Sequence, residues 1–202
     1  MKDIAYPLIA FTGPSGAGKS TLARHALSII PKMFPGTSST FSVSDTTRQT
    51  VRPGEIAGRD YNFIPVADFE EKINLGAYVE WEQYRTEDYY GTPRSEIENA
   101  QRSQSILIFD VDTKGAHSLK KELGENLLTI FVAPPSFEEL ERRLRARNTE
   151  SEEEIQKRLQ IAREELLKQN DFDILIVNGD LSQALYECQN RVESFIRSRI
   201  QK

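Results

Sequence analysis

The chain has 202 residues, of which 38% are hydrophobic and 28% are charged, and its net charge at pH 7 is -5. These values are typical of a globular protein with one sizeable α/β domain, and they exclude an intrinsically disordered chain. The negative charge disfavours a nucleic acid as the main partner. No apolar run approaches the ~20 residues of a membrane span, so we expect no membrane association.

The start of the chain and its cysteine content both favour a cytoplasmic protein. Asp3 and Pro7 interrupt the first residues, and the apolar run that follows has only the length of a strand, so no signal peptide is predicted. Cys188 is the single cysteine, which excludes an internal disulfide framework and suits a reducing compartment. Its apolar neighbours at helical spacing predict a buried position for the thiol.

Residues 13–20 read Gly-Pro-Ser-Gly-Ala-Gly-Lys-Ser and match the phosphate-binding pattern G-x-x-x-x-G-K-[ST]. The apolar residues 8–11 before this loop predict a buried strand, and apolar residues at helical spacing after it predict a helix that begins at the loop. In this context backbone N–H groups converge on a phosphate at the helix N-terminus. Lys19 adds a charge for the β- and γ-phosphates, and the Ser20 hydroxyl can bind Mg²⁺. We therefore predict a nucleoside triphosphate bound by Gly13, Ser15, Gly16, Ala17, Gly18, Lys19, Ser20 and Thr21.

Strands and helices alternate along the rest of the chain, which predicts an α/β fold with a parallel sheet. The further predicted strands are 105–109, 127–132 and 174–177. The further predicted helices are 66–75, 93–102, 113–123, 137–145, 152–168 and 181–197. Capping boxes at Ser136-x-x-Glu139 and Ser151-x-x-Glu154 support two of these helices. The segment 41–92, rich in aromatic residues, prolines and glycines, breaks the alternation and is interpreted as an insertion over the main sheet.

Several ordered motifs follow the phosphate-binding loop. They are Ser-Asp-Thr-Thr-Arg at 44–48, Arg-Pro-Gly-Glu at 52–55, Gly-Arg-Asp-Tyr at 58–61, Glu-Trp at 80–81, Tyr-Tyr-Gly-Thr at 89–92, and a strand ending in Asp110 and Asp112. Together they resemble guanylate kinase, which moves the γ-phosphoryl group of ATP to GMP. The resemblance covers nearly the whole chain. It implies a three-layer α/β/α core, an inserted GMP-binding segment and a helical lid.

The resemblance also assigns an acceptor site, and the residue types suit it. A phosphate needs cationic forks and hydroxyl groups, which Arg48, Arg52, Tyr61 and Tyr90 supply. Guanine presents N1–H and N2–H₂ donors side by side, and a carboxylate is the natural bidentate acceptor for that edge. By resemblance this carboxylate is Glu80, with the hydroxyl groups of Ser44 and Thr92 facing the O6 edge and Asp112 near the amino group.

Asp110 ends an apolar strand, where phosphate-loop enzymes place an acid that helps to hold Mg²⁺. The alternative is a carboxylate that only caps the next helix. We favour a role in binding Mg²⁺ for Asp110 and a role in binding the guanine base for Asp112.

An arginine cluster between 142 and 158 is interpreted as part of the lid. Arg143, Arg147 and Arg158 match the family's phosphate-gripping arginines, which neutralise the transferring group when the lid closes. Arg142 and Arg145 are expected on a solvated face, and the helix is expected to break at 148–149. Asn178 matches a position near the adenine ring.

The implied reaction is a direct, Mg²⁺-dependent in-line transfer from ATP to GMP with lid closure. The resemblance divides the single domain into three parts. They are a core of about 1–40, 93–140 and 160–202, the insertion of about 41–92 and a lid of about 141–159. The predicted catalytic residues are Lys19, Arg48, Arg143, Arg147 and Arg158. Two alternatives are a ribose-bisphosphate kinase, which should lack the guanine-reading residues, and a non-catalytic phosphopeptide-binding module, which typically has a degraded loop.

The sequence departs from the family pattern in three places. Arg48 and Arg52 are four positions apart where three is usual, and the stretch from Glu80 to Tyr90 is one residue longer. Lys114 stands where a glutamine is common.

Overall fold

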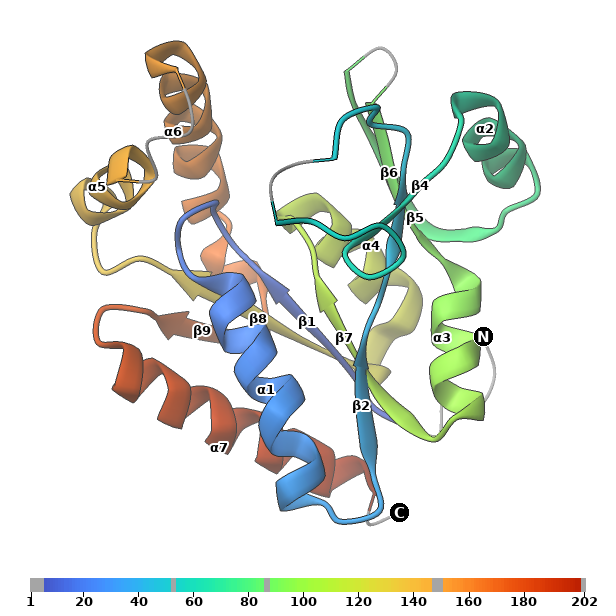
Figure 1. Ribbon diagram of the computed structural model, residues 1–202. Helices are drawn as coiled ribbons and strands as arrows, with labels where there is room; N and C mark the ends of the chain where they lie inside the picture. The colour runs from blue at the N-terminus through green and yellow to red at the C-terminus, as the bar shows by residue number, and fades with distance from the viewer. Residues whose placement is uncertain (1–5, 52–53, 86–87, 147–150, 201–202) are drawn as a thin grey trace.

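The main sheet of this computed structural model, which describes residues 6–51, 54–85, 88–146 and 151–200, has five parallel strands in the order β2-β7-β1-β8-β9 (Figure 1). Its strands are β1 (Leu8–Thr12), β2 (Ser38–Phe41), β7 (Ser105–Asp110), β8 (Leu127–Ala133) and β9 (Ile174–Val177). The predicted α/β fold with a parallel sheet is confirmed. β1 lies in the centre, so the loop that follows it opens at the edge where the carboxyl ends of the strands meet.

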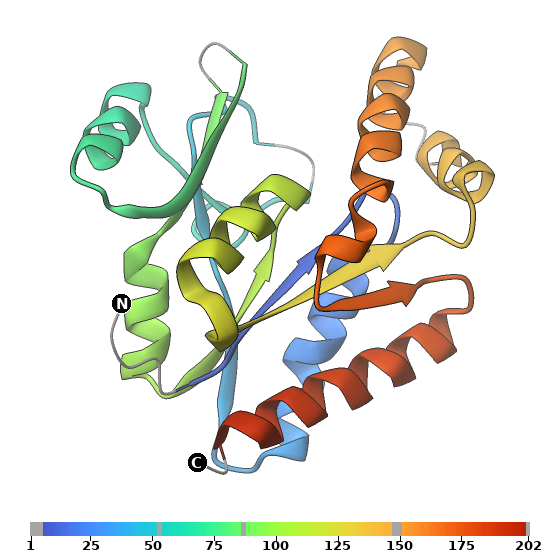
Figure 2. The same ribbon diagram turned by 180° about the vertical axis from the view of Figure 1, so that it is seen from behind.

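Helices cover both faces of this sheet. Figure 1 shows α1 (Lys19–Met33) and α7 (Leu181–Ile200) in front of it, and Figure 2, seen from behind, shows α3 (Arg94–Arg102) and α4 (Thr113–Leu123) on the opposite face. Ile9 and Phe11 of β1 pack in the cluster on the α1 side, whereas Leu8 and Ala10 pack on the other side. Because both faces of β1 are covered, its sequence is apolar without alternation.

A second, mixed sheet lies within the segment expected to be an insertion. Its order is β4-β3-β6-β5, with β3 (Ser44–Thr46), β4 (Tyr61–Phe63), β5 (Tyr78–Arg85) and β6 (Asp88–Pro93), and α2 (Val66–Asn74) accompanies it. Four aromatic rings, those of Phe69, Tyr78, Trp81 and Tyr89, pack together in this unit. None of these strands was predicted, because β3 and β4 are only three residues long and the sheet carries many polar side chains.

The second sheet lies on one side of the edge where the carboxyl ends of the main strands meet, and two helices lie on the other side (Figures 1 and 2). They are α5 (Phe137–Ala146) and α6 (Glu152–Leu166). The predicted break at 148–149 lies outside the described residues. Ser151 forms the predicted capping box with Glu154. At Ser136 the hydroxyl accepts from the Glu139 backbone N–H at 3.2 Å, while the Glu139 carboxylate contacts two arginines instead.

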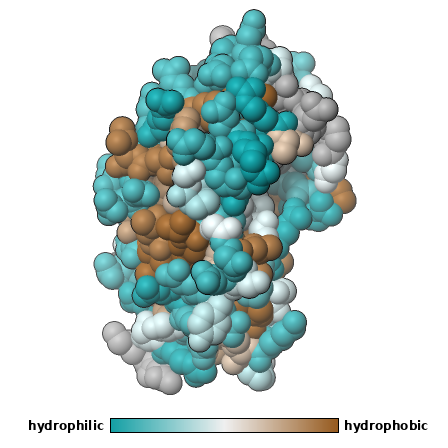
Figure 3. All heavy atoms as spheres, turned by 90° about the vertical axis from the view of Figure 1, so that its left-hand side faces the viewer, coloured by the Kyte–Doolittle hydropathy of each residue, from teal (hydrophilic) through white to brown (hydrophobic). Residues whose placement is uncertain are grey.

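The remaining elements are two short 3₁₀ helices, Gly124–Asn126 and Gln169–Asp171. Cys188 is fully buried, as predicted, and burial raises the pKa of its thiol to about 12. Within the described ranges, every helix is too short or too polar to span a bilayer. Figure 3 shows one face of the molecule, where apolar side chains form separate patches among hydrophilic ones.

Candidate active site

The phosphate-binding loop joins β1 to α1. Gly18 caps α1 with φ 98°, in the left-handed region that favours glycine. A Cβ atom at Gly18 would lie 2.2 Å from Nδ2 of Asn178, so the close approach also requires glycine. Lys19 Nζ donates to the carbonyl oxygens of Gly13 at 2.7 Å and Pro14 at 3.2 Å. The ammonium group therefore lies over the loop that the sequence assigns to the phosphates.

Asn178 supports this loop from behind. It follows β9, is 6% exposed, and its Nδ2 donates to the Ala17 carbonyl at 2.8 Å. Its backbone N–H donates to Ala133 at the end of β8. The structure thus gives Asn178 a loop-fixing contact that the sequence did not reveal.

Ser20 and Asp110 meet at the carboxyl edge of the sheet. Ser20 Oγ donates to Asp110 Oδ2 at 2.5 Å, although the two residues lie 90 positions apart. Asp110 does not cap the next helix, because Asp112 is the N-cap of α4 and accepts from the Gly115 N–H at 2.7 Å. The capping alternative for Asp110 is therefore wrong.

The hydroxyl and carboxylate oxygens of Ser20 and Asp110 are the hard donors that Mg²⁺ prefers. Among the described residues, no group of three or more His, Cys, Asp or Glu side chains could hold a metal ion. A cation at this pair would therefore draw its other ligands from phosphate oxygens and water.

The predicted guanine-reading residues come together from three adjacent strands and α4. Thr92 Oγ1 donates to Glu80 Oε1 at 2.5 Å, and Ser44 Oγ lies 3.5 Å from Thr92 Oγ1. Asp112 approaches from α4: a Cβ atom at Gly115 would lie 3.3 Å from both Asp112 Oδ1 and Glu80 Oε2. The two carboxylates therefore converge over a glycine that the sequence reasoning did not single out.

Burial raises the pKa of Glu80 to about 7. The hydrogen bond from Thr92 lowers this pKa, whereas the nearby charges of Asp112 and Glu82 raise it. A buried carboxyl group with a pKa near neutrality is typical of a functional site.

The predicted acceptor-phosphate residues form a second group on the same sheet. Arg48 is 9% exposed, and its guanidinium lies over the rings of Tyr61 at 5.8 Å and Phe63 at 5.4 Å. The Tyr61 and Tyr90 rings meet edge to face at 5.8 Å. Glu55, to which the sequence gave no role, accepts from Arg48 Nη2 at 2.6 Å. Arg52 lies outside the described residues.

Two of the predicted lid arginines lie beside the phosphate-binding loop. Arg158 Nη1 donates to Ser15 Oγ at 2.9 Å. Arg143 donates to Glu139 Oε1 at 2.8 Å and to the Asn178 carbonyl at 3.0 Å. Arg147 lies outside the described residues.

Guanylate kinases are similar to this chain over most of its length. Residues 6–195 match the family model for guanylate kinase. A guanylate kinase from Salinibacter ruber is 40% identical over 191 residues, covering 95% of this chain and 97% of the relative. Another from a Nostoc species is 43% identical over 178 residues, covering 88% and 85%. The chain belongs to the guanylate kinase family.

A solved structure supports the same assignment. The crystal structure of guanylate kinase from Anaplasma phagocytophilum aligns with a TM-score of 0.69 and 26% identity, covering 96% of this chain and 88% of that chain. Family membership confirms the resemblance drawn from the motifs, and the alignment agrees with the parallel sheet and the separate mixed sheet.

Arg142 and Arg145 are exposed, as predicted, but Arg145 is more than a solvated side chain. It pairs with Glu141 at 2.8 Å on its own helix and with Glu152 at 2.5 Å at the start of α6. Arg145 therefore joins α5 to α6, whereas Arg142 pairs only with Glu139 among the described contacts.

Sequence reasoning missed Glu165 and Thr113. Thr113 Oγ1 donates to Glu165 Oε1 at 3.4 Å, which joins the end of α6 to the start of α4. Burial raises the pKa of Glu165, while the charge of Lys19 lowers it and that of Asp112 raises it. The available signal was the seven-residue spacing from Arg158, which puts both side chains on one helix face.

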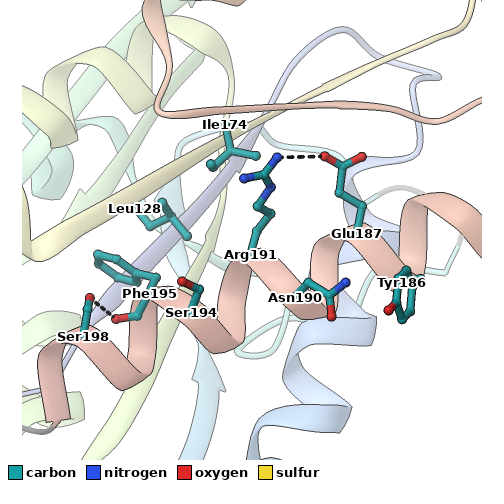
Figure 4. Close-up of a pocket in the computed structure, with 9 residues that line it drawn as sticks. All are labelled: Leu128, Ile174, Tyr186, Glu187, Asn190, Arg191, Ser194, Phe195 and Ser198. Carbon is teal, nitrogen blue, oxygen red and sulfur yellow. Dashed lines mark hydrogen bonds and ion pairs between the residues drawn. The ribbon is translucent and has the colours of Figure 1, made fainter.

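A separate groove runs along α7, away from these residues (Figure 4). Its apolar wall includes Leu128, Ile174 and Phe195, and its arginine, Arg191, pairs with Glu187 at 3.5 Å. It contains none of the predicted site residues. With its arginine already paired, this groove offers little for a nucleotide phosphate.

Proposed function

We propose that this member of the guanylate kinase family transfers the γ-phosphoryl group of ATP to GMP, giving ADP and GDP. This proposal is supported above all by the convergence of the hydroxyl group of Thr92 with the carboxylates of Glu80 and Asp112. This set accepts the N1–H and N2–H₂ donors of guanine, and adenine lacks that pair of donors. The intact phosphate-binding loop favours a kinase over a non-catalytic binding module.

The division of the chain follows from this assignment. The core comprises about 1–40, 93–140 and 160–202, the GMP-binding insertion about 41–92, and the lid about 141–159. Support comes from the second sheet, which lies wholly within 44–93, and from α5 and α6, which flank the phosphate-binding loop on the other side.

ATP occupies the loop residues 13–21 with Asn178 behind them, and GMP occupies the second sheet. Ser44, Glu80, Thr92 and Asp112 read the base, and Arg48, Arg52, Tyr61 and Tyr90 hold the phosphate. The contacts of Arg48 with Glu55 and the two aromatic rings fix its guanidinium in direction, which suits bidentate phosphate binding. Lys19 and the lid residues Arg143, Arg147 and Arg158 neutralise the transferring group.

Mg²⁺ would be held by Ser20 and Asp110, whose oxygen donors fit it. When bound, the ion would supply positive charge that neutralises the nucleotide phosphates. The transfer needs no covalent enzyme intermediate, since positioning and charge stabilisation suffice for in-line phosphoryl transfer. Closure of α5 and α6 excludes water, which would otherwise hydrolyse ATP.

A coupled assay of ADP formation with GMP, AMP, CMP and UMP tests this function. We expect turnover with GMP and little with the other three. Glu80→Gln should lower kcat/KM for GMP by ~10²-fold or more, because one guanine donor then faces an amide N–H₂. Glu98→Gln, an exposed surface change on α3, is the matched control. The assignment would be contradicted if the parent enzyme used AMP as efficiently as GMP. It would also be contradicted if Glu80→Gln kept the parent's kcat/KM for GMP.

A further inference from the structure

Glu165 lies near the end of α6, between the phosphate-binding loop and the start of α4. Arg158 precedes it by seven residues, which is about two helical turns, so both side chains lie on one face of α6. Arg158 contacts Ser15 at 2.9 Å, and Glu165 accepts from Thr113 at 3.4 Å. A single helix face thus contacts both the ATP loop and the residue that follows the base-reading Asp112.

The two ends of α6 have different surroundings. Ile155 and Leu159 pack with the apolar residues of α5. Leu166 packs instead against a core cluster that contains Phe131 of the main sheet. If α5 moves together with the first turns of α6, the motion pivots near the end of α6, where Glu165 lies.

The surroundings of Glu165 disfavour the charge of its carboxylate. Burial raises the pKa of its carboxyl group, and Lys19 opposes that shift while Asp112 adds to it. Because the net shift is upward, the ionised carboxylate lowers the folding stability at neutral pH. A group kept at a cost to stability is typical of a functional position.

We propose that Glu165 is a positioning residue for phosphoryl transfer: held by Thr113 at the pivot of α6, its charge orients Lys19 and aligns it with Arg158 on the donor phosphates. This inference rests on the proposed ATP:GMP transfer. Lys19 donates to carbonyl groups of its own loop and interacts electrostatically with Glu165, whose carboxyl group is held by Thr113. An anion fixed in this way restricts the directions that the flexible lysine side chain can take. A purely structural Glu165 would need the hydrogen bond to Thr113 but not the charge.

Glu165→Gln separates these two roles, because the amide keeps an acceptor for Thr113 and loses the charge. We expect kcat to fall about tenfold, with KM for ATP within about threefold of the parent. We expect Tm to be equal to or above that of the parent, since a desolvated charge is removed. Glu164→Gln, the exposed neighbouring residue, is the matched control and should keep the parent's kcat and Tm.

Two further variants complete the test. Thr113→Val removes the hydroxyl group and keeps the shape, so it should lower kcat less than Glu165→Gln does. In the double variant of Glu165→Gln with Arg158→Ala, the loss in kcat should be smaller than the product of the two single losses, because both residues align the same phosphates.

The outcomes distinguish this inference from the proposed function. A parent enzyme without GMP transfer would overturn both. An active parent in which Glu165→Gln turns over like Glu164→Gln would overturn the positioning role alone. So would a Glu165→Gln variant that loses kcat and Tm together to the same extent as Thr113→Val, since the side chain would then act only through its hydrogen bond.

Discussion

Thr92 and Glu80 face each other across β6 and β5, and the threonine hydroxyl donates a 2.5 Å hydrogen bond to a carboxyl group whose pKa burial raises to about 7. On the proposed assignment, guanine adds two donors to this carboxyl group, which accepts both only when it is ionised. GMP binding should therefore depend on the protonation state of Glu80.

We expect kcat/KM for GMP to rise with pH and to level off above about pH 7, because the ionised form of Glu80 then predominates. Below that pH it should fall by a factor of about ten per pH unit. The measurement is a pH profile of kcat/KM for GMP at saturating ATP. In Glu80→Gln this fall in kcat/KM at low pH should be absent. If the fall persists in the variant, it is caused by the titration of another group.

The same shift predicts an effect on stability. Glu80 has a raised pKa in the folded protein, so between its ordinary value of 4.5 and about 7 the unfolded chain ionises while the folded chain does not. Its ionisation therefore lowers the free energy of unfolding progressively over this range. At pH 8, Glu80→Gln should be more stable than the parent, by on the order of 1–3 kcal/mol. A denaturant titration at pH 8 and at pH 4.5 tests this, with the difference expected at pH 8 only.

Lys19→Met should abolish transfer and leave the fold intact. Lys19 Nζ donates to two carbonyl groups of the phosphate-binding loop. The loss should appear mainly in kcat and amount to on the order of 3–4 kcal/mol, as for removal of one charge that stabilises the transition state. Steady-state kinetics together with a thermal melt measure both effects. If the turnover of Lys19→Met is within tenfold of the parent's, Lys19 is not a catalytic residue.

How much of this molecule could be predicted depended on how locally each feature is encoded. β1 and the loop after it were predictable because a strand buried on both faces is a continuous apolar run, and the loop motif is contiguous. β2 was missed because it lies at the sheet edge and consists mostly of serine and threonine. Pairing with β7 makes it a strand, and pairing partners far apart in sequence leave no local signal.

The site shows the same contrast. Glu80 and Asp112 were predictable from family motifs, whereas the glycine that lets them converge became meaningful only in three dimensions. Glu165 belongs to a helix with glutamates at 152, 153, 154 and 164, and in the sequence it resembles another solvated charge. Its contact with Thr113 spans 52 positions, so only the tertiary structure distinguishes it.

The lid assignment predicts different effects for two neighbouring cations of α6. Arg158 contacts the phosphate-binding loop, whereas Lys157 is exposed. Arg158→Ala should lower kcat by about 10²-fold and leave GMP binding without ATP nearly unchanged, because its contribution belongs to the closed, transition-state form. Lys157→Ala is the control of equal charge. Arg145 is unsuitable as that control, since its ion pairs join α5 to α6. Equal losses in both variants would mean that bulk positive charge, and not a specific contact, is responsible.

The longer loop between Arg48 and Arg52 gives the last prediction. Arg48 already donates to the Thr50 carbonyl and pairs with Glu55 at 2.6 Å. Its positive charge is thus partly neutralised before GMP arrives, and a second cation is needed to balance a dianionic phosphate. Arg52→Ala should therefore weaken GMP binding by roughly 1.5–3 kcal/mol, the scale of a lost charged hydrogen bond. Arg59 is exposed and pairs with Asp60, so Arg59→Ala should leave GMP binding unchanged. Calorimetric titration with GMP measures both. If Arg52→Ala also binds GMP normally, the extra loop residue carries Arg52 out of the site, and Arg48 holds the phosphate with Tyr61 and Tyr90 alone.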